Sequence, residues 1–214
     1  MSLTLDLSSG DAAGLKASFD RVTHAAANAG AVLIAAAGND AFDLANPRYI
    51  QIPAQSRDVL AVVASTNPDC SENLIPGAAC VTGTPSLAYY SNRGVPLNAV
   101  AAPGGSYPAG SYEGASGWVR GACSSGKPGT ADGPPSDANH SQGCFNLGHA
   151  DYVQAIGTSA SAPLVAGVAA LVRSAHPEWS GATVLAAIRA SAVPTTTMPY
   201  GVVDATAALA YVPK

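Results

Sequence analysis

A serine that could act as a nucleophile lies in segment 157–163, Gly-Thr-Ser-Ala-Ser-Ala-Pro. Pro163 has no N–H, and inside a helix its ring would clash with the carbonyl of residue 159, so Ser159 is predicted at or before the first turn of a helix. Unpaired N–H groups and the helix dipole favour developing negative charge there. That setting suits a serine that generates an oxyanion. A serine that only caps a core helix rich in Ala and Gly fits this segment equally well.

Asn39 is the second candidate, because it follows the apolar run Ala31–Ala37 and a glycine that lets the backbone turn. Such a turn presents the Asn amide at the carboxyl edge of a strand, where α/β sheets place ligands. An Asn side-chain N–H can donate to an oxyanion. Taken alone, an ordinary Asn-Asp turn is the simpler interpretation.

Together these segments resemble the subtilase family of serine proteases. Residues 157–167 match its serine motif, Gly-Thr-Ser-x-(Ala/Ser)-x-Pro followed by Val-Ala-Gly, with Leu164 where the family usually has a His that is not the catalytic base. Residues 36–39 match its Ala-Ala-Gly-Asn. Further matches follow in the family's order over nearly the whole chain, at residues 90–94, 100–104, 176–179 and 200–205.

The resemblance implies a serine endopeptidase that acts on polypeptides by acyl transfer. Ser159 would be the nucleophile, and Asn39 with the backbone N–H of Ser159 would form the oxyanion hole. Asp40, next to this site, hints only weakly at a preference for basic residues before the scissile bond. The resemblance also implies two walls of a substrate pocket. One wall is a strand with Thr4 in place of the family's Gly, and it consists of Ser2, Leu3 and Thr4. The other wall is a second strand with the turn that follows it, and it consists of Ala35, Ala36, Ala37 and Gly38.

The Asp and His that activate the serine in subtilases are missing from this sequence. The family runs Asp, His, Ser along the chain, and neither Asp-(Ser/Thr)-Gly nor His-Gly-Thr-His occurs. Residues 1–214 are therefore expected to be the C-terminal portion of one catalytic domain, truncated at the N-terminus and inactive by itself. An alternative is a catalytically dead subtilase-like module that binds a ligand or complements an N-terminal chain. An unrelated Gly/Ala-rich α/β domain is a third interpretation, which the ordered motifs argue against.

No histidine of this sequence is expected to replace the missing base. His24 falls on the polar face of a predicted helix, and His176 lies about 25 Å along the serine helix from Ser159. His140 and His149 fall in a long loop, where surface histidines are the simplest interpretation.

The elements that must position these residues alternate between helices and apolar strands. This order predicts a three-layer α/β fold, with a mainly parallel sheet and helices on both faces. A helix over Asp11–Asn28 has Leu15, Phe19, Val22 and Ala26 on one face and ends at Gly30. The serine helix is expected to be central and buried, because small residues surround it. The remaining predicted elements are strands at Ala31–Ala37, Val59–Ala64 and Asn98–Ala102, helices at Ser159–Ala175, Ser180–Ala190 and Asp204–Ala210, and a loop-rich insertion at about 104–155.

Composition narrows the possible partners. The chain has 48% hydrophobic and 11% charged residues, a net charge of −4 and no Lys/Arg-rich run, so nucleic acid and anionic membranes are not expected as partners. The longest apolar run, Ala160–Val172, is too short to span a bilayer. No organic cofactor is implied. Calcium is common in the family, but no Asp/Glu cluster marks a site for it or another metal.

The four cysteines, Cys70, Cys80, Cys123 and Cys144, lie in loop-rich stretches. An even count there indicates two disulfides and an extracellular location, with the export signal absent from this chain; four free thiols are the alternative. Of three connectivities, we predict Cys70–Cys80 and Cys123–Cys144, each stabilising its loop by a few kcal/mol on the chain-entropy model. Peptide mapping without reduction tests the pairing, and four alkylatable thiols would contradict it.

Overall fold

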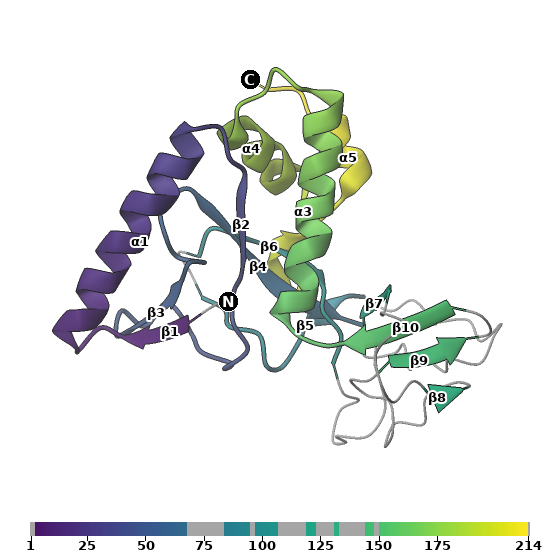
Figure 1. The fold of residues 1–214 in the computed structure, drawn as a ribbon, viewed down its shortest axis with the longest axis horizontal. Coiled ribbons are helices and arrows are strands. Elements are labelled where there is room, and N and C mark those ends of the chain that lie inside the picture. The colour runs from purple at the N-terminus through teal and green to yellow at the C-terminus, as the bar shows by residue number, and fades with distance from the viewer. Residues whose placement is uncertain are drawn as a thin grey trace.

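The computed structural model describes residues 3–67, 84–94, 97–106, 119–122, 131–132, 144–147 and 150–213. Its main sheet has six strands, ordered β11-β12-β6-β4-β2, with β5 paired to β4. Figure 1 labels β2, β4, β5 and β6 of this sheet. The pairs β2–β4, β4–β6 and β6–β12 are parallel, whereas β11–β12 and β4–β5 are antiparallel. The strands are β2 (Leu33–Ala36), β4 (Val59–Thr66), β5 (Ser86–Leu87), β6 (Ala99–Pro103), β11 (Val193–Thr195) and β12 (Met198–Val202). The mixed sheet with helices confirms the predicted α/β class.

Helices α3 (Thr158–Ala175), α4 (Gly181–Ser191) and α5 (Ala205–Leu209) pack on one face of this sheet. Ser180 caps α4 by accepting from Thr183 N, and Asp204 caps α5 by accepting from Ala207 N. The strands β4 and β6 are continuous apolar runs because both of their faces are buried. The shared core consists of Leu60, Val62, Val100, Ala102, Val165, Ala169, Val172, Val184, Ala187, Ile188 and Ala208.

The opposite face of the sheet is covered by connecting segments. Leu44, Ala54, Leu97 and Met198 bury it, together with alternate residues of β2, β4 and β6. This alternation is the two-residue period of a strand, which sends successive side chains to opposite faces. The sheet is therefore packed on both faces where it carries β4 and β6.

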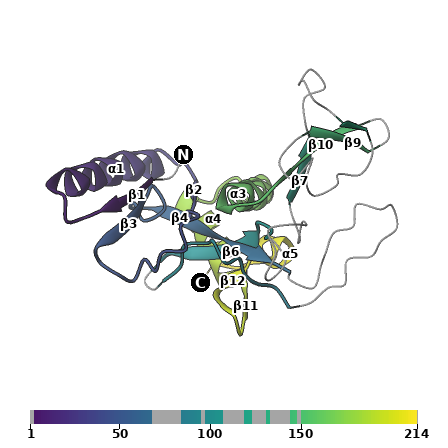
Figure 2. The same cartoon turned by 90° about the horizontal axis from the view of Figure 1, so that it is seen from below.

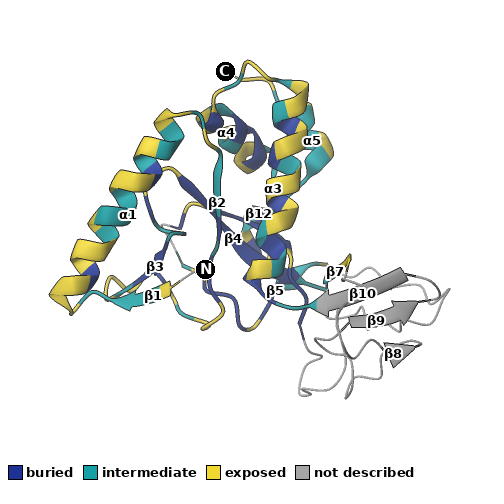
Figure 3. Cartoon of the chain, in the orientation of Figure 1, coloured by how far each residue is buried: buried dark blue, intermediate teal, exposed yellow. Residues whose placement is uncertain are grey.

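Helix α1 (Gly10–Asn28) forms as predicted and ends at Gly30, which has φ +91°. Much of α1 is exposed, as the yellow stretches of this helix in Figure 3 show. On its apolar face Val22 is 67% and Leu15 38% accessible. The described part of the chain therefore leaves Leu15 and Val22 largely uncovered. The polar face makes the contacts instead, because it finds hydrogen-bond partners in the turn before β4.

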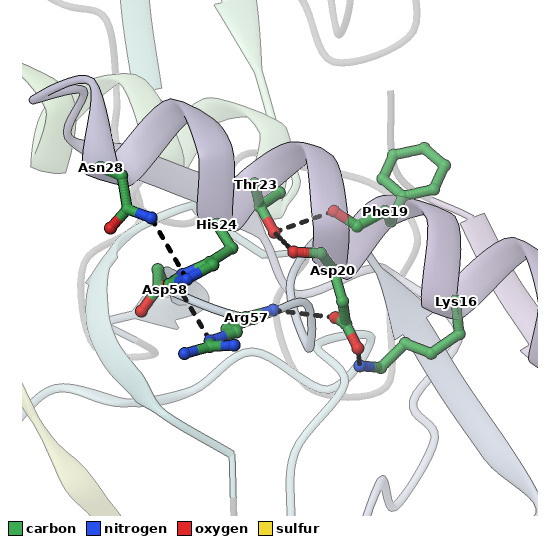
Figure 4. Close-up of polar contacts among 8 residues, drawn as sticks. All are labelled: Lys16, Phe19, Asp20, Thr23, His24, Asn28, Arg57 and Asp58. Carbon is green, nitrogen blue, oxygen red and sulfur yellow. Dashed lines mark hydrogen bonds and ion pairs between the residues drawn. The ribbon is translucent and has the colours of Figure 1, made fainter.

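Figure 4 shows these polar contacts of α1. Asp20 Oδ1 accepts from Arg57 N at 2.9 Å, and Asp20 also pairs with Lys16 one turn earlier. His24 Nδ1 lies 2.7 Å from Asp58 Oδ2, and its Nε2 lies 3.2 Å from Asn28 Nδ2. Surface ion pairs of this kind contribute about 0–1 kcal/mol each, so α1 is held less firmly than α3.

Helix α3 is central but only partly buried. Val165 and Val172 face the sheet, whereas Leu164 and Leu171 are 39% and 54% accessible. The prediction of a fully buried helix is wrong, because no described segment covers its outer face. None of the helices in the described ranges is long and apolar enough to cross a membrane.

Segment 104–155 was expected to be loop-rich, and it contains short strands in the ranges that are described. β7 (Val119–Ala122), β10 (Ala150–Ala155), β9 (Cys144–Leu147) and β8 (Ala131–Asp132) pair in that order as a second sheet, seen to one side of the main sheet in Figure 2. The predicted disulfides fall outside the described residues at Cys70, Cys80 and Cys123. A third, two-stranded sheet pairs β1 (Leu3–Asp6) with β3 (Tyr49–Ile52).

Two glycines near α3 predict opposite effects of substitution by alanine. A Cβ at Gly167 meets nothing within 4 Å, so Gly167→Ala should stabilise the chain by about 0.5–1 kcal/mol through helix propensity. A Cβ at Gly104 would come within 3.0 Å of Ser161 Oγ and Ala64 Cβ. Gly104→Ala should therefore destabilise by about 1–3 kcal/mol. Thermal unfolding measures both, at about 2–4 °C per kcal/mol for a chain of this size; a higher Tm for Gly104→Ala would contradict the packing described.

Candidate active site

The first turn of α3 carries Ser159, as the position of Pro163 predicted. Gly157 precedes the helix with φ +130°, a conformation that side chains other than glycine rarely adopt. Thr158 is buried, whereas Ser159 is exposed. Neither the N–H nor the hydroxyl of Ser159 has a hydrogen-bond partner within the described residues. The serine therefore reaches solvent from a helix N-terminus, with a backbone donor beside it.

Asn39 lies directly against this helix start. Its Oδ1 accepts from Thr158 N and from Thr158 Oγ1, both at 2.9 Å, and Thr158 Oγ1 accepts from Gly38 N at 3.1 Å. With Oδ1 occupied, Asn39 Nδ2 has no partner in the part of the chain that the structure describes. The amide orientation is thus fixed so that its N–H groups stay available beside Ser159.

Two glycines permit this close approach. Gly38 has φ +98°, and a Cβ there would come within 3.0 Å of Asn92 Nδ2 and Gln51 Oε1. At Gly157 a Cβ would lie 3.3 Å from Asn39 Nδ2. Side chains at either position would strain the backbone or push Asn39 away from the helix.

A groove of about 470 Å³ runs from Ser159 between β2 and α3. Ala35 and Ala36, two predicted substrate-binding residues, line it. Ala37 is fully buried in the sheet core, and Gly38 is buried in the turn that follows. The other residues lining the groove are apolar: Ile34, Pro53, Ala162, Pro163 and Ala166.

The other predicted pocket wall lies partly within the described chain, whereas Ser2 lies outside it. Leu3 and Thr4 belong to β1, which pairs antiparallel with β3. Thr4 Oγ1 donates to Asp40 Oδ2 at 2.8 Å and also contacts Gln51 Oε1. Thr4 is thereby brought next to the turn that carries Asn39, and Asp40 is engaged by a hydroxyl.

No described histidine contacts Ser159. His24 is engaged by Asp58 and Asn28, and the His176 ring stacks on Trp179 with a centroid distance of 3.9 Å. His140 and His149 lie outside the described residues. Among those that are described, no group of three or more His, Cys, Asp or Glu side chains could hold a metal ion. Within the described residues, the site brings an exposed serine hydroxyl together with N–H donors, and neither His24 nor His176 is bonded to it.

Thr158, Tyr90 and Asn92 support this site through hydrogen bonds, although no sequence motif predicted a role for them. Thr158 belongs to the recognised serine motif, and the other two lie in segment 90–94, which was matched only as a family resemblance. Burial of their polar side chains would have indicated a supporting role, because a buried polar side chain must be hydrogen-bonded. Burial, however, cannot be seen in one sequence.

Comparison with known proteins gives one family and a consistent fold. The model of the subtilase family, peptidase S8, matches residues 1–208. A subtilisin-like protease of Solanum lycopersicum, SBT3, is 41% identical over 61 residues, which cover 28% of this chain and 8% of that protein.

Solved structures with similar folds are proteases. A lanthipeptide protease superposes with a TM-score of 0.69 at 22% identity over 98% of this chain. A protease from Pseudoalteromonas arctica gives 0.60 at 28% over 89%, and the epidermin leader peptide processing protease of Staphylococcus aureus gives 0.59 at 17% over 97%. This chain spans 59%, 45% and 47% of their respective lengths.

Proposed function

The chain belongs to the subtilase family, and on that basis we propose that it carries the nucleophile and the oxyanion hole of a serine endopeptidase. The observation that carries this proposal is the geometry around Ser159. An exposed hydroxyl, an unpaired backbone N–H and the oriented amide of Asn39 meet at one helix N-terminus. Donors aimed at a developing oxyanion are usually the largest single contribution to such catalysis.

In the proposed reaction, Ser159 Oγ attacks the scissile carbonyl carbon and its proton passes to a base. The carbonyl oxygen becomes an oxyanion, which accepts hydrogen bonds from Asn39 Nδ2 and Ser159 N–H. Collapse of this intermediate breaks the C–N bond, and the leaving amine takes the proton from the base. Water then attacks the acyl-Ser159 ester by the same steps, which releases the acid and restores the hydroxyl.

The base and its orienting carboxylate are proposed to come from the N-terminal part of the catalytic domain, as a partner segment or as the preceding chain. The apolar surface of α3 supports this proposal, because Leu164 and Leu171 are exposed on this helix and a separate apolar groove lies between it and β2. Burying apolar area is worth about 25 cal/mol per Å². Polypeptide substrates, secretion and disulfides are part of the same proposal.

A catalytically dead module that binds peptides or partners is the second candidate. The observation in its favour is that both described histidines, His24 and His176, are engaged away from Ser159. A covalent probe for activated serines separates the two candidates. Labelling of a complete subtilase domain containing this chain, lost in Ser159→Ala, supports the protease; an unlabelled complete domain supports the binding module.

Asn39→Ala in the complete domain should lower kcat far more than KM. The amide donates to an oxyanion that exists only in the transition state, so ground-state binding loses little. We expect a loss of about a hundredfold or more in kcat, a magnitude borrowed from the oxyanion asparagine of subtilisin itself. Steady-state kinetics with a chromogenic peptide measure the two constants. A change in KM alone would mean that Asn39 only lines the pocket.

The 214-residue chain alone should not hydrolyse peptides at a useful rate. A serine hydroxyl without a positioned base is a weak nucleophile at neutral pH, and loss of the base costs several orders of magnitude. A chromogenic assay on the purified chain, with Ser159→Ala as control, checks this. Turnover abolished by Ser159→Ala would contradict the prediction and point to His140 or His149 as the base. Turnover that persists in the variant would reveal a contaminating protease.

A further inference from the structure

The buried segment Tyr90–Asn92 lies beneath both halves of the proposed oxyanion hole. The main sheet anchors it: Ala88 N donates to Ala64 O at 2.9 Å, and Ser91 Oγ accepts from Ala64 N at 3.1 Å. Ser91 and Asn92 are fully buried, and Tyr90 is nearly so. Three consecutive polar residues are therefore fixed to β4, the most buried strand of the fold.

Asn92 holds the turn that presents Asn39. Its Nδ2 donates to Ala37 O at 2.9 Å, and its Oδ1 accepts from Asp40 N at 3.1 Å and Phe42 N at 2.9 Å. The backbone N–H of Asn92 donates to Gly38 O at 3.0 Å. These bonds grip the turn before and after Asn39, so the position of Asn39 relative to β4 depends on Asn92.

Tyr90 holds the start of α3, which carries the other half of the proposed oxyanion hole. Its hydroxyl accepts from Gly157 N at 2.9 Å and lies 2.7 Å from both Gly104 O and Gly105 O, so its single proton is donated to one carbonyl or shared between them. Burial raises the pKa of Tyr90, which keeps this proton on the phenol at neutral pH. Gly157 lies two residues before Ser159.

We propose that Tyr90 and Asn92 are positioning residues that together set the distance and orientation between the two oxyanion donors, Asn39 Nδ2 and the N–H of Ser159. The inference rests on the proposed function of this site. The donors come from segments about 120 positions apart, and a three-residue segment hydrogen-bonds to both. Small errors in such geometry cost a large factor in rate, because the donors act only when preorganised.

Tyr90→Phe in a complete subtilase domain containing this chain tests the idea with little risk to folding, because the ring remains and Gly157 N still donates to Gly104 O at 2.9 Å. We expect kcat to fall about tenfold, with KM within about twofold. The matched control is Tyr200→Phe, which removes a phenol bonded to the backbone of Gly94, with Gly94 N 2.5 Å from its oxygen. The control should leave kcat within about twofold.

A double-mutant cycle separates positioning from general stability. In an Asn39→Ala background, Tyr90→Phe should lower kcat by less than about twofold, because the position of the two donors relative to each other no longer matters once the Asn39 donor is gone. Asn92→Ser, whose side chain is too short to span the turn, should behave in the same way with a larger loss in the wild-type background. Equal losses in both backgrounds, or equal effects of Tyr90→Phe and Tyr200→Phe, would overturn the proposal.

A readout that is independent of turnover keeps the two proposals distinct. If the complete domain does not hydrolyse peptides, the proposed function fails. The positioning role is then decided by ¹⁵N NMR of the same protein. Tyr90→Phe must move the Asn39 side-chain amide and Ser159 backbone resonances, and Tyr200→Phe must not. Unmoved resonances in Tyr90→Phe would overturn the inference whatever the activity.

Discussion

The geometry of the site depends on the hydrogen bonds of Thr158, a buried residue at the start of α3. Thr158 accepts from Gly38 N and donates through its N–H and hydroxyl to Asn39 Oδ1. These bonds tie the carboxyl end of β2 to the N-terminus of α3 across about 120 residues of sequence. They are possible only because Gly38 and Gly157 take positive φ and carry no side chain at the contact. The core between sheet and helix keeps the two ends in reach of each other.

The sequence predicted those parts of the fold in which local chemistry and tertiary packing agree. The apolar run of β4 and the Ser180 cap of α4 are found almost where the pattern placed them, because each is decided by neighbours along the chain. The face of α1 was not predictable, since its apolar residues follow the helical period but its contacts come from Asp20 and His24. Tertiary partners overrode the pattern there.

The candidate site likewise contains residues that the sequence predicts and residues that it does not predict. Ser159 and Asn39 could be found because a proline, two glycines and a strand end restrict the backbone around them. Asn92 could not be found, because an Asn in a loop is usually interpreted as a turn residue. Only its burial shows that its amide must be fully hydrogen-bonded. The residues proposed to do chemistry lie in restricted motifs, whereas those that hold them in place are recognised by their three-dimensional surroundings.

In the proposed function, oxyanion stabilisation and proton transfer place different demands on this chain. The donors need a fixed geometry relative to each other, and the hydrogen bonds that fix it link β2, β4, β6 and α3. That geometry is coupled to the sheet core by these hydrogen bonds, so a change that loosens β4 or the start of α3 would also displace a donor. The proposed base needs only to meet the hydroxyl of Ser159, which is exposed. A proton acceptor can thus be supplied from outside the described fold without disturbing the network that holds the oxyanion donors.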